Sequence, residues 1–242
     1  MTVRIARQAA FALTASLAFM GGAAQAVTVY DATADFSAVN NANGVWSYGS
    51  QALLGVGFTL YTHAEPLLSP SVIGSANGWN AGSGALPWVA KAGASGWQCC
   101  SVGGVTAYVG AGELTLHPGP NKELSVVRFT APVAGSYQVS GAFWGQDDGS
   151  NSGGQGPGTT TDVHVRTAAG DLFTSAINGF GVGTTVSFNQ VVTLNAGATL
   201  DFIVGTGPNT GASSYYNDST GLRATVTAVP EPSGIALSGL GL

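Results

Sequence analysis

Charged side chains are scarce in this sequence. Only 8% of its 242 residues are Asp, Glu, Lys or Arg, and the formal net charge is -5. The few basic residues form no cluster, whereas binding to phosphate groups needs a basic patch. We therefore expect no nucleic-acid partner. With 37 glycines, the composition is typical of exported β-proteins that have many turns.

The sequence also lacks the short motifs of common enzymes. It contains no GxSxG nucleophile elbow, HExxH zinc motif, phosphate-binding loop or dinucleotide-binding fingerprint. A glycosidase needs two carboxylates about 5 to 10 Å apart, and Asp162 with Asp147 or Asp148 is a pairing that would serve. We expect a non-catalytic protein, with a polysaccharide hydrolase as the enzymatic alternative.

Cysteine is nearly absent as well. The two cysteines, Cys99 and Cys100, are adjacent, so a disulfide between them would close a small local ring and would not cross-link distant parts of the fold. No CxxC pair or histidine cluster accompanies them, which argues against a metal site. We expect a vicinal disulfide or intermolecular pairing in preference to a reactive thiol.

Helical periodicity is missing after residue 26, where no stretch carries an apolar stripe at i, i+3, i+4 and i+7. β-Branched and aromatic residues instead alternate with polar ones. The clearest such segments are 56–62, 112–117, 123–130, 136–144, 161–167, 185–194, 199–205 and 222–227. The pattern predicts an all-β fold, an antiparallel β-sandwich of the jelly-roll kind. Residues 63–104, rich in Gly, Ser and Ala around three Trp, predict a loop-rich insertion.

Alternation along the predicted strands separates an inner from an outer face. The valines of Asp-Val-His-Val-Arg point inward, which leaves Asp162, His164 and Arg166 in a row on an outer face. The same alternation turns Asp201 and Arg223 outward. Such a row is either a sugar-binding surface or a solvated face of the sheet, and both interpretations remain open here.

Aromatic residues next to polar ones suggest carbohydrate recognition, in which a ring stacks on a sugar and polar side chains add hydrogen bonds. The binding candidates are Trp46, Tyr48, Trp79, Trp97, Trp144 and Tyr216, together with the row Asp162, His164 and Arg166. Packing in the core is the alternative role for each Trp, because an indole ring buries a large apolar area.

Oxygen ligands near the ends of predicted strands suggest calcium as a cofactor. The candidate ligands are Asp147, Asp148, Asn217 and Asp218. Their spacing matches no EF-hand loop, and an acidic, glycine-rich turn is the alternative interpretation.

The first 26 residues have the parts of a secretory signal peptide. Arg4 and Arg7 give a positive start, an apolar run follows, and Ala24-Gln25-Ala26 has the small-x-small form that a signal peptidase needs. The apolar run is shorter than the ~20 residues of a spanning helix. We therefore expect an exported chain that begins near Val27.

The segment Val229-Pro230-Glu231-Pro232-Ser233, followed by small and apolar residues, resembles the PEP-CTERM sorting signal. That signal occurs on exported proteins of Gram-negative bacteria, often makers of exopolysaccharide or biofilm. In the family, Pro-Glu-Pro precedes a transmembrane segment and an Arg-rich tail, and an exosortase is thought to recognise and cleave it. Here the chain ends ten residues after Pro232 without a basic cluster, so the match is partial.

The body of the chain adds to this resemblance. Segments 116–120, 127–139, 160–165 and 217–222 look like the β-sandwich ectodomains common among PEP-CTERM proteins, which resemble carbohydrate-binding modules. The resemblance implies an exopolysaccharide or other glycan as ligand, exosortase as a partner, transient membrane association through the C-terminal signal, and a place on the cell surface, in the Gram-negative envelope or outside the cell.

The expected organisation is a signal peptide at 1–26, a β-sandwich ectodomain at 27–228 and a partial sorting segment at 229–242. The expected function is that of a non-catalytic surface or matrix protein that binds exopolysaccharide. A purely structural or adhesive matrix protein is the alternative from another class.

Overall fold

The computed structural model describes residues 27–67, 73–82, 86–101, 104–149, 158–208 and 215–230. These residues form strands and connections without any helix, so none of them belongs to a helix that could cross a membrane. The predicted signal peptide, and Glu231 and Pro232 of the sorting motif, lie outside the described residues. Those assignments therefore stay predictions.

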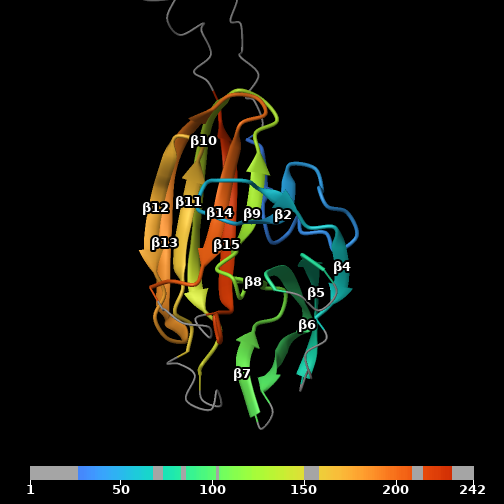
Figure 1. Ribbon diagram of the computed structural model, residues 1–242. Helices are drawn as coiled ribbons and strands as arrows, with labels where there is room; N and C mark the ends of the chain where they lie inside the picture. Colours follow the sequence, from blue (N-terminus) through green and yellow to red (C-terminus); the bar gives the residue numbers. More distant parts are fainter. Residues whose placement is uncertain are drawn as a thin grey trace, which may run out of the picture. The chain divides into compact units, whose positions relative to one another are not determined.

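The strands form two antiparallel sheets (Figure 1). Sheet A has the order β13-β10-β15-β8-β6-β5-β4, with β1 paired to β15 and β7 paired to β6. Its strands are β1 (Val29–Asp31), β4 (His63–Pro66), β5 (Ile73–Asn80), β6 (Trp88–Ser101), β7 (Gly104–Val109), β8 (Leu114–His117), β10 (Gly135–Gly145), β13 (Gly181–Leu194) and β15 (Thr220–Val229).

Sheet B has the order β12-β11-β14-β9-β2-β3. Its strands are β2 (Trp46–Gln51), β3 (Thr59–Leu60), β9 (Leu124–Thr130), β11 (Asp162–Thr167), β12 (Gly170–Ala176) and β14 (Thr199–Gly205). All described pairings in both sheets are antiparallel.

Strands β8 to β15 form a jelly roll. In this stretch the chain changes sheet at every connection except the one from β11 to β12, which are neighbours in sheet B. The result is β13-β10-β15-β8 in one layer and β12-β11-β14-β9 in the other, the two four-stranded layers of a jelly roll. The predicted antiparallel β-sandwich is thus confirmed. Strands β2 and β3 add to the edge of sheet B next to β9, and β6, β5 and β4 add to sheet A next to β8.

The predicted alternation holds along β10, where Tyr137, Val139 and Phe143 are 1%, 0% and 0% exposed. Gln138 and Ser140, on the other side of the strand, are half-buried. Because side chains alternate between the two faces of a strand, this pattern fixes which side of sheet A meets the core.

The prediction of a loop-rich insertion at 63–104 is wrong. The described part of that segment consists mainly of strands β4, β5 and β6. Its glycines mark close approach between strands: a Cβ at Gly78 would lie 2.4 Å from the carbonyl oxygen of Val89 on β6. Glycine and alanine here serve tight strand packing, which composition alone does not distinguish from a loop.

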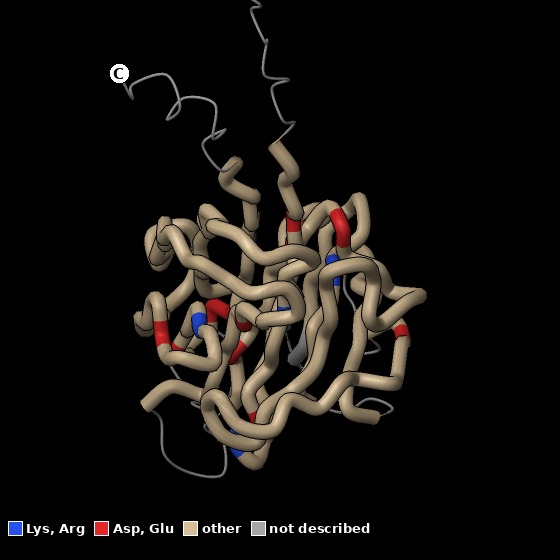
Figure 2. The backbone as a smooth tube through the Cα atoms, turned by 90° about the horizontal axis from the view of Figure 1, so that it is seen from above, with Lys and Arg blue, Asp and Glu red and all other residues tan. Residues whose placement is uncertain are grey.

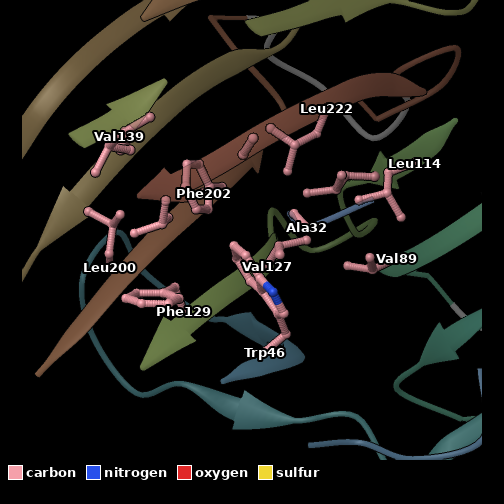
Figure 3. Close-up of a cluster of buried hydrophobic side chains, with 14 of the residues drawn as sticks. Ala32, Trp46, Val89, Leu114, Val127, Phe129, Val139, Leu200, Phe202 and Leu222 are labelled. Carbon is pink, nitrogen blue, oxygen red and sulfur yellow. The ribbon is translucent and has the colours of Figure 1, made fainter. Parts of the chain in front are cut away.

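Aromatic rings fill the space between the two sheets (Figure 3). The Phe129 ring lies 5.4 Å from Trp46, 5.3 Å from Tyr30 and 5.7 Å from Tyr137, measured between centroids. Phe202 extends the same group at 6.2 Å from Trp46. Since Phe129 and Phe202 come from sheet B and Tyr137 from sheet A, these rings join the layers.

Replacing Phe129 with Ala tests this core. We expect Phe129→Ala to lower the free energy of unfolding by about 3 to 5 kcal/mol, because the fully buried ring leaves a cavity that its neighbours fill only in part. Urea unfolding measures the loss. The control is Val39→Ala, at a side chain 83% exposed, which should change stability by less than about 0.5 kcal/mol. Equal effects of the two substitutions would contradict the assignment of the core.

Candidate functional site

Four of the predicted binding aromatics belong to the interior. Trp46, Tyr48, Trp79 and Trp97 are 1%, 0%, 6% and 0% exposed, so they offer no ring face to a ligand. Figure 3 shows Trp46 pointing between the sheets toward Phe129. The prediction was wrong for these four because all of them lie on strands that the sequence did not reveal.

Trp79 and Trp97 each have structural partners in the interior. The indole nitrogen of Trp79 donates a hydrogen bond to the carbonyl oxygen of Ser37 at 2.7 Å. Trp97 packs in a smaller apolar cluster that includes Cys99. Cys99 is buried and disulfide-bonded, in line with the expectation of a disulfide in preference to a reactive thiol, while the side chain of Cys100 lies outside the described residues.

The polar row on sheet B points outward as predicted, but its members already have partners: Asp162 pairs with His164, and Arg166 pairs with Asp171 on β12. Asp162 Oδ2 lies 3.1 Å from His164 Nε2, and the amide of Gly207 donates to Asp162 Oδ1 at 2.7 Å. Arg166 Nη1 donates to Asp171 Oδ1 at 2.9 Å. Burial alone would raise the pKa of Asp162, but the hydrogen bonds from His164 and Gly207 outweigh it and hold that pKa below its usual value.

The connection between β2 and β3 covers part of the same outer face. Gln51 donates from Nε2 to Asp201 Oδ2 at 2.9 Å and accepts the amide of Gly55 at 2.9 Å. The Arg128 guanidinium, paired with Asp201 at 2.6 Å, lies 3.9 Å over the ring of Phe58. The outer face of sheet B is therefore occupied by structural contacts, which favours the structural interpretation of the row.

The outer face of sheet A is different, because it is hollowed. Two adjoining hollows of about 320 and 550 Å³ share Thr33 and Arg223 in their linings. Trp144 lies in the smaller one, while Ser140 and Thr225, whose hydroxyls are 2.9 Å apart, line the larger one. We call the two together the sheet A groove.

Trp144 and Arg223 form the centre of this groove. Trp144 stands opposite Gly221 in the ladder between β10 and β15, and a Cβ at Gly221 would lie 2.1 Å from the indole ring. The ring thus rests directly on the backbone of β15. The Arg223 guanidinium carbon is 5.9 Å from the ring centroid, and Arg223 forms no ion pair within the described part of the chain.

Two acidic residues hold the rim of the groove in place. Asp31 Oδ1 accepts the amides of Thr33 and Ala34 at 2.8 and 2.9 Å. Glu113 Oε2 accepts the amide of Gly110 at 2.9 Å and the side chain of Gln146 at 3.0 Å. These bonds fix the turns on either side, so the groove is bounded by anchored backbone.

The structure separates the remaining predicted binding residues. Trp144 lies on the outer face of sheet A, whereas Asp162, His164 and Arg166 lie on the outer face of sheet B. The outer faces of a sandwich point in opposite directions, so these residues do not meet one ligand. Tyr216 is 43% exposed and stacks on Tyr215 with centroids 4.6 Å apart, which covers one side of its ring.

Two of the predicted calcium ligands, Asp147 and Asp218, are buried and accept hydrogen bonds from the chain itself. Nowhere in the described residues do three His, Cys, Asp or Glu side chains gather as metal ligands would. The amide of Asp148 bonds to Thr106, and Asn217 adopts a left-handed φ of 62°.

Asp147 and Asp218 instead form a buried acidic pair. Asp147 Oδ2 accepts the amide of Ser219 at 2.7 Å, and Asp218 Oδ1 accepts the amide and hydroxyl of Thr160 at 2.9 and 3.1 Å. Burial raises the pKa of Asp147 to about 6 and that of Asp218 to about 8, and repulsion between the two acids adds to the rise for Asp218. Asp218 therefore keeps a proton at neutral pH.

Charge is sparse and scattered over the backbone (Figure 2), so the groove residues stand out only once the strands are paired. Arg223 could be placed outward by alternation, but nothing in the sequence pairs residue 144 with residue 221. The roles of Gly221, Asp31 and Glu113 depend on contacts between distant segments, and sequence reasoning missed them.

Comparison with known proteins identifies no family. No protein-family model matches the chain, and no curated protein matches it either. Solved structures with partial similarity include a family 35 carbohydrate-binding module from Clostridium thermocellum, at 13% identity and a TM-score of 0.27, covering 45% of this chain and 72% of that one.

Two more are family 6 modules. One is the C-terminal module of LamC from Zobellia galactanivorans, at 10% identity and a TM-score of 0.26, covering 47% of this chain and 79% of that one. The other, from Cellvibrio mixtus lichenase 5A in complex with cellotriose, has 16% identity and a TM-score of 0.25 and covers 49% and 79%. Similarity of this degree assigns no ligand to the present chain.

The buried acidic pair predicts that stability falls as pH rises. Between about pH 4 and pH 8 the folded protein retains a proton on Asp218 that the unfolded chain has lost, because the folded pKa of about 8 lies above the ordinary value of 3.8 for an aspartate. Asp218→Asn removes this titration. We expect it to flatten the pH dependence and to raise stability at pH 8 by an amount on the order of a few kcal/mol.

Urea unfolding of both proteins across this pH range measures the effect. A residual slope below about pH 6 should remain, since Asp147 still titrates there. Parallel pH curves for the wild type and Asp218→Asn would show that Asp218 is not protonated in the folded state.

Proposed function

We propose that this protein binds a glycan in the sheet A groove, with the Trp144 ring as the stacking surface. The single observation that carries the proposal is the position of that ring, which rests on Gly221 inside a hollow and beside Arg223. A half-buried aromatic ring that lines a hollow can stack on the apolar face of a sugar ring.

The surroundings of Trp144 fit a polyhydroxylated ligand. The hydroxyls of Ser140 and Thr225 and the guanidinium of Arg223 supply donors and acceptors along the groove. Both hollows have volumes within the range of about 300 to 1,000 Å³ that small-ligand sites occupy. A few polar groups around an apolar platform is the usual composition of such sites.

We propose further that the protein is not an enzyme. Asp147 and Asp218 are 2% and 0% exposed, and Asp162 is bonded to His164 and Gly207. The pairing of Asp162 with Asp147 considered for a glycosidase therefore offers no accessible pair of carboxylates. Asp31 and Glu113, at the rim of the groove, are each engaged in fixing a turn.

An exopolysaccharide is the glycan that we propose as ligand, and export to the cell surface or matrix is the proposed location. The signal-peptide pattern at 1–26 and the partial Pro-Glu-Pro sorting motif support this placement, with exosortase and transient membrane association as its corollaries. A purely structural or adhesive matrix role is the second candidate, and strand β13, a long sheet edge without charged residues, favours it.

Trp144→Ala tests the proposed function. Affinity gels that contain individual bacterial exopolysaccharides, run with and without calcium, should retard the wild-type protein on at least one glycan. We expect Trp144→Ala to weaken that binding about tenfold or more, which corresponds to about 1.4 kcal/mol. Gly221→Ala should weaken it too, because the added methyl group displaces the ring.

Two control variants separate the faces of the sandwich. Arg166→Gln on sheet B and Tyr216→Ala should leave the retardation unchanged, since neither residue lines the groove. The proposal fails if no glycan retards the wild type. It also fails if Trp144→Ala binds as tightly as the wild type.

A further inference from the structure

Strand β13 is an edge of sheet A along its whole length. It pairs with β10 on one side, and within the described residues no backbone hydrogen bond reaches its other side between Val186 and Leu194. In that stretch the ladder with Gly135–Phe143 runs without a register shift. The edge is therefore long and regular.

The other sheet edges of this molecule are protected in the ways that natural β-proteins use. Strand β3 has two residues, and β4 has four residues that include Glu65 and Pro66. Strand β12 carries Asp171 and a register irregularity opposite Arg166. Residues 146–148 bond to the outer side of β7.

From Val186 to Leu194, strand β13 has none of these protections, because the register irregularity in its ladder with β10 lies before Val186. Its sequence, GVGTTVSFNQVVTL, contains no charged residue and no proline. It is rich in Val and Thr, which favour strands. Its outward-facing residues Ser187, Asn189, Val191 and Thr193 are exposed, so no segment among the described residues covers that face of the strand.

We propose that β13 pairs with the β13 strand of a second copy of this chain, so that two sheets A join across a two-fold axis. In antiparallel self-pairing the side chain on the axis faces its own counterpart and those next to it lie close to theirs, so a charge there would meet a like charge. A strand without charges over 14 residues avoids that repulsion. An unrelated partner would not require this, so the sequence of the edge favours a second copy.

The test introduces a charge near the middle of the regular ladder, at Val191, which is 63% exposed. Analytical ultracentrifugation of the purified wild-type protein should show a dimer that dissociates on dilution. Val191→Lys and Val191→Glu should each weaken the dimer about tenfold or more. An equimolar mixture of the two variants should restore it, because the introduced charges then have opposite signs.

Matched controls distinguish lost pairing from lost folding. Thr174→Lys places the same charge at an exposed position on the β12 edge and should leave the dimer intact. Circular dichroism of each variant should match that of the wild type. Hydrogen exchange of the amides in residues 186–194 should speed up when the wild type is diluted.

Three outcomes would overturn the proposal. The first is a wild-type protein that stays monomeric up to about 1 mM, a concentration at which even an association of about 4 kcal/mol would be visible. The second is a dimer that Val191→Lys leaves unchanged. The third is a mixture of the two charge variants that remains monomeric although both are folded.

Discussion

The ladder between β10 and β15 is the constraint on which the rest of the structure depends. It joins ten residue pairs, from Ser136 with Val229 to Gly145 with Thr220. On its inner side it places Phe143 beside Leu222 in the core. On its outer side it sets Trp144 on Gly221, so one register determines both the core and the groove. A slip of one residue would exchange the two faces.

The two outer faces of the sandwich divide the roles that the sequence had suggested for one surface. On sheet B the polar side chains satisfy one another, and the β2–β3 connection fixes Arg128 and Asp201 under a cover that includes Phe58. On sheet A the acids at the rim hold turns, while Arg223 is left without an acidic partner among the described residues. The outer face of sheet A is thus the one that carries both a guanidinium without an acidic partner among the described residues and the half-buried Trp144.

Local pattern was enough to predict the sandwich. Alternation of side chains marked seven of the strands, β8 to β11 and β13 to β15, and turned Tyr137, Val139 and Val163 inward, as the structure confirms. Of the eighth predicted segment, 56–62, only Thr59–Leu60 forms a strand. Alternation could not predict the strands within 63–104, because Gly and Ala at close strand contacts have the composition of loops. The site could not be predicted from the sequence either. Trp46 and Trp97 are buried by residues far away in the sequence. The contact of Trp144 with Gly221 depends on the register between β10 and β15, which no local pattern indicates.

The most direct test of glycan binding in the sheet A groove is chemical-shift mapping by NMR during titration with oligosaccharides cut from a retarding exopolysaccharide. The account predicts shifts at the Trp144 indole N–H and at the amides of Ser140, Arg223 and Thr225, with Asp162 and Arg166 on sheet B unchanged. Shifts confined to sheet B, with the Trp144 indole signal unmoved at saturation, would contradict it.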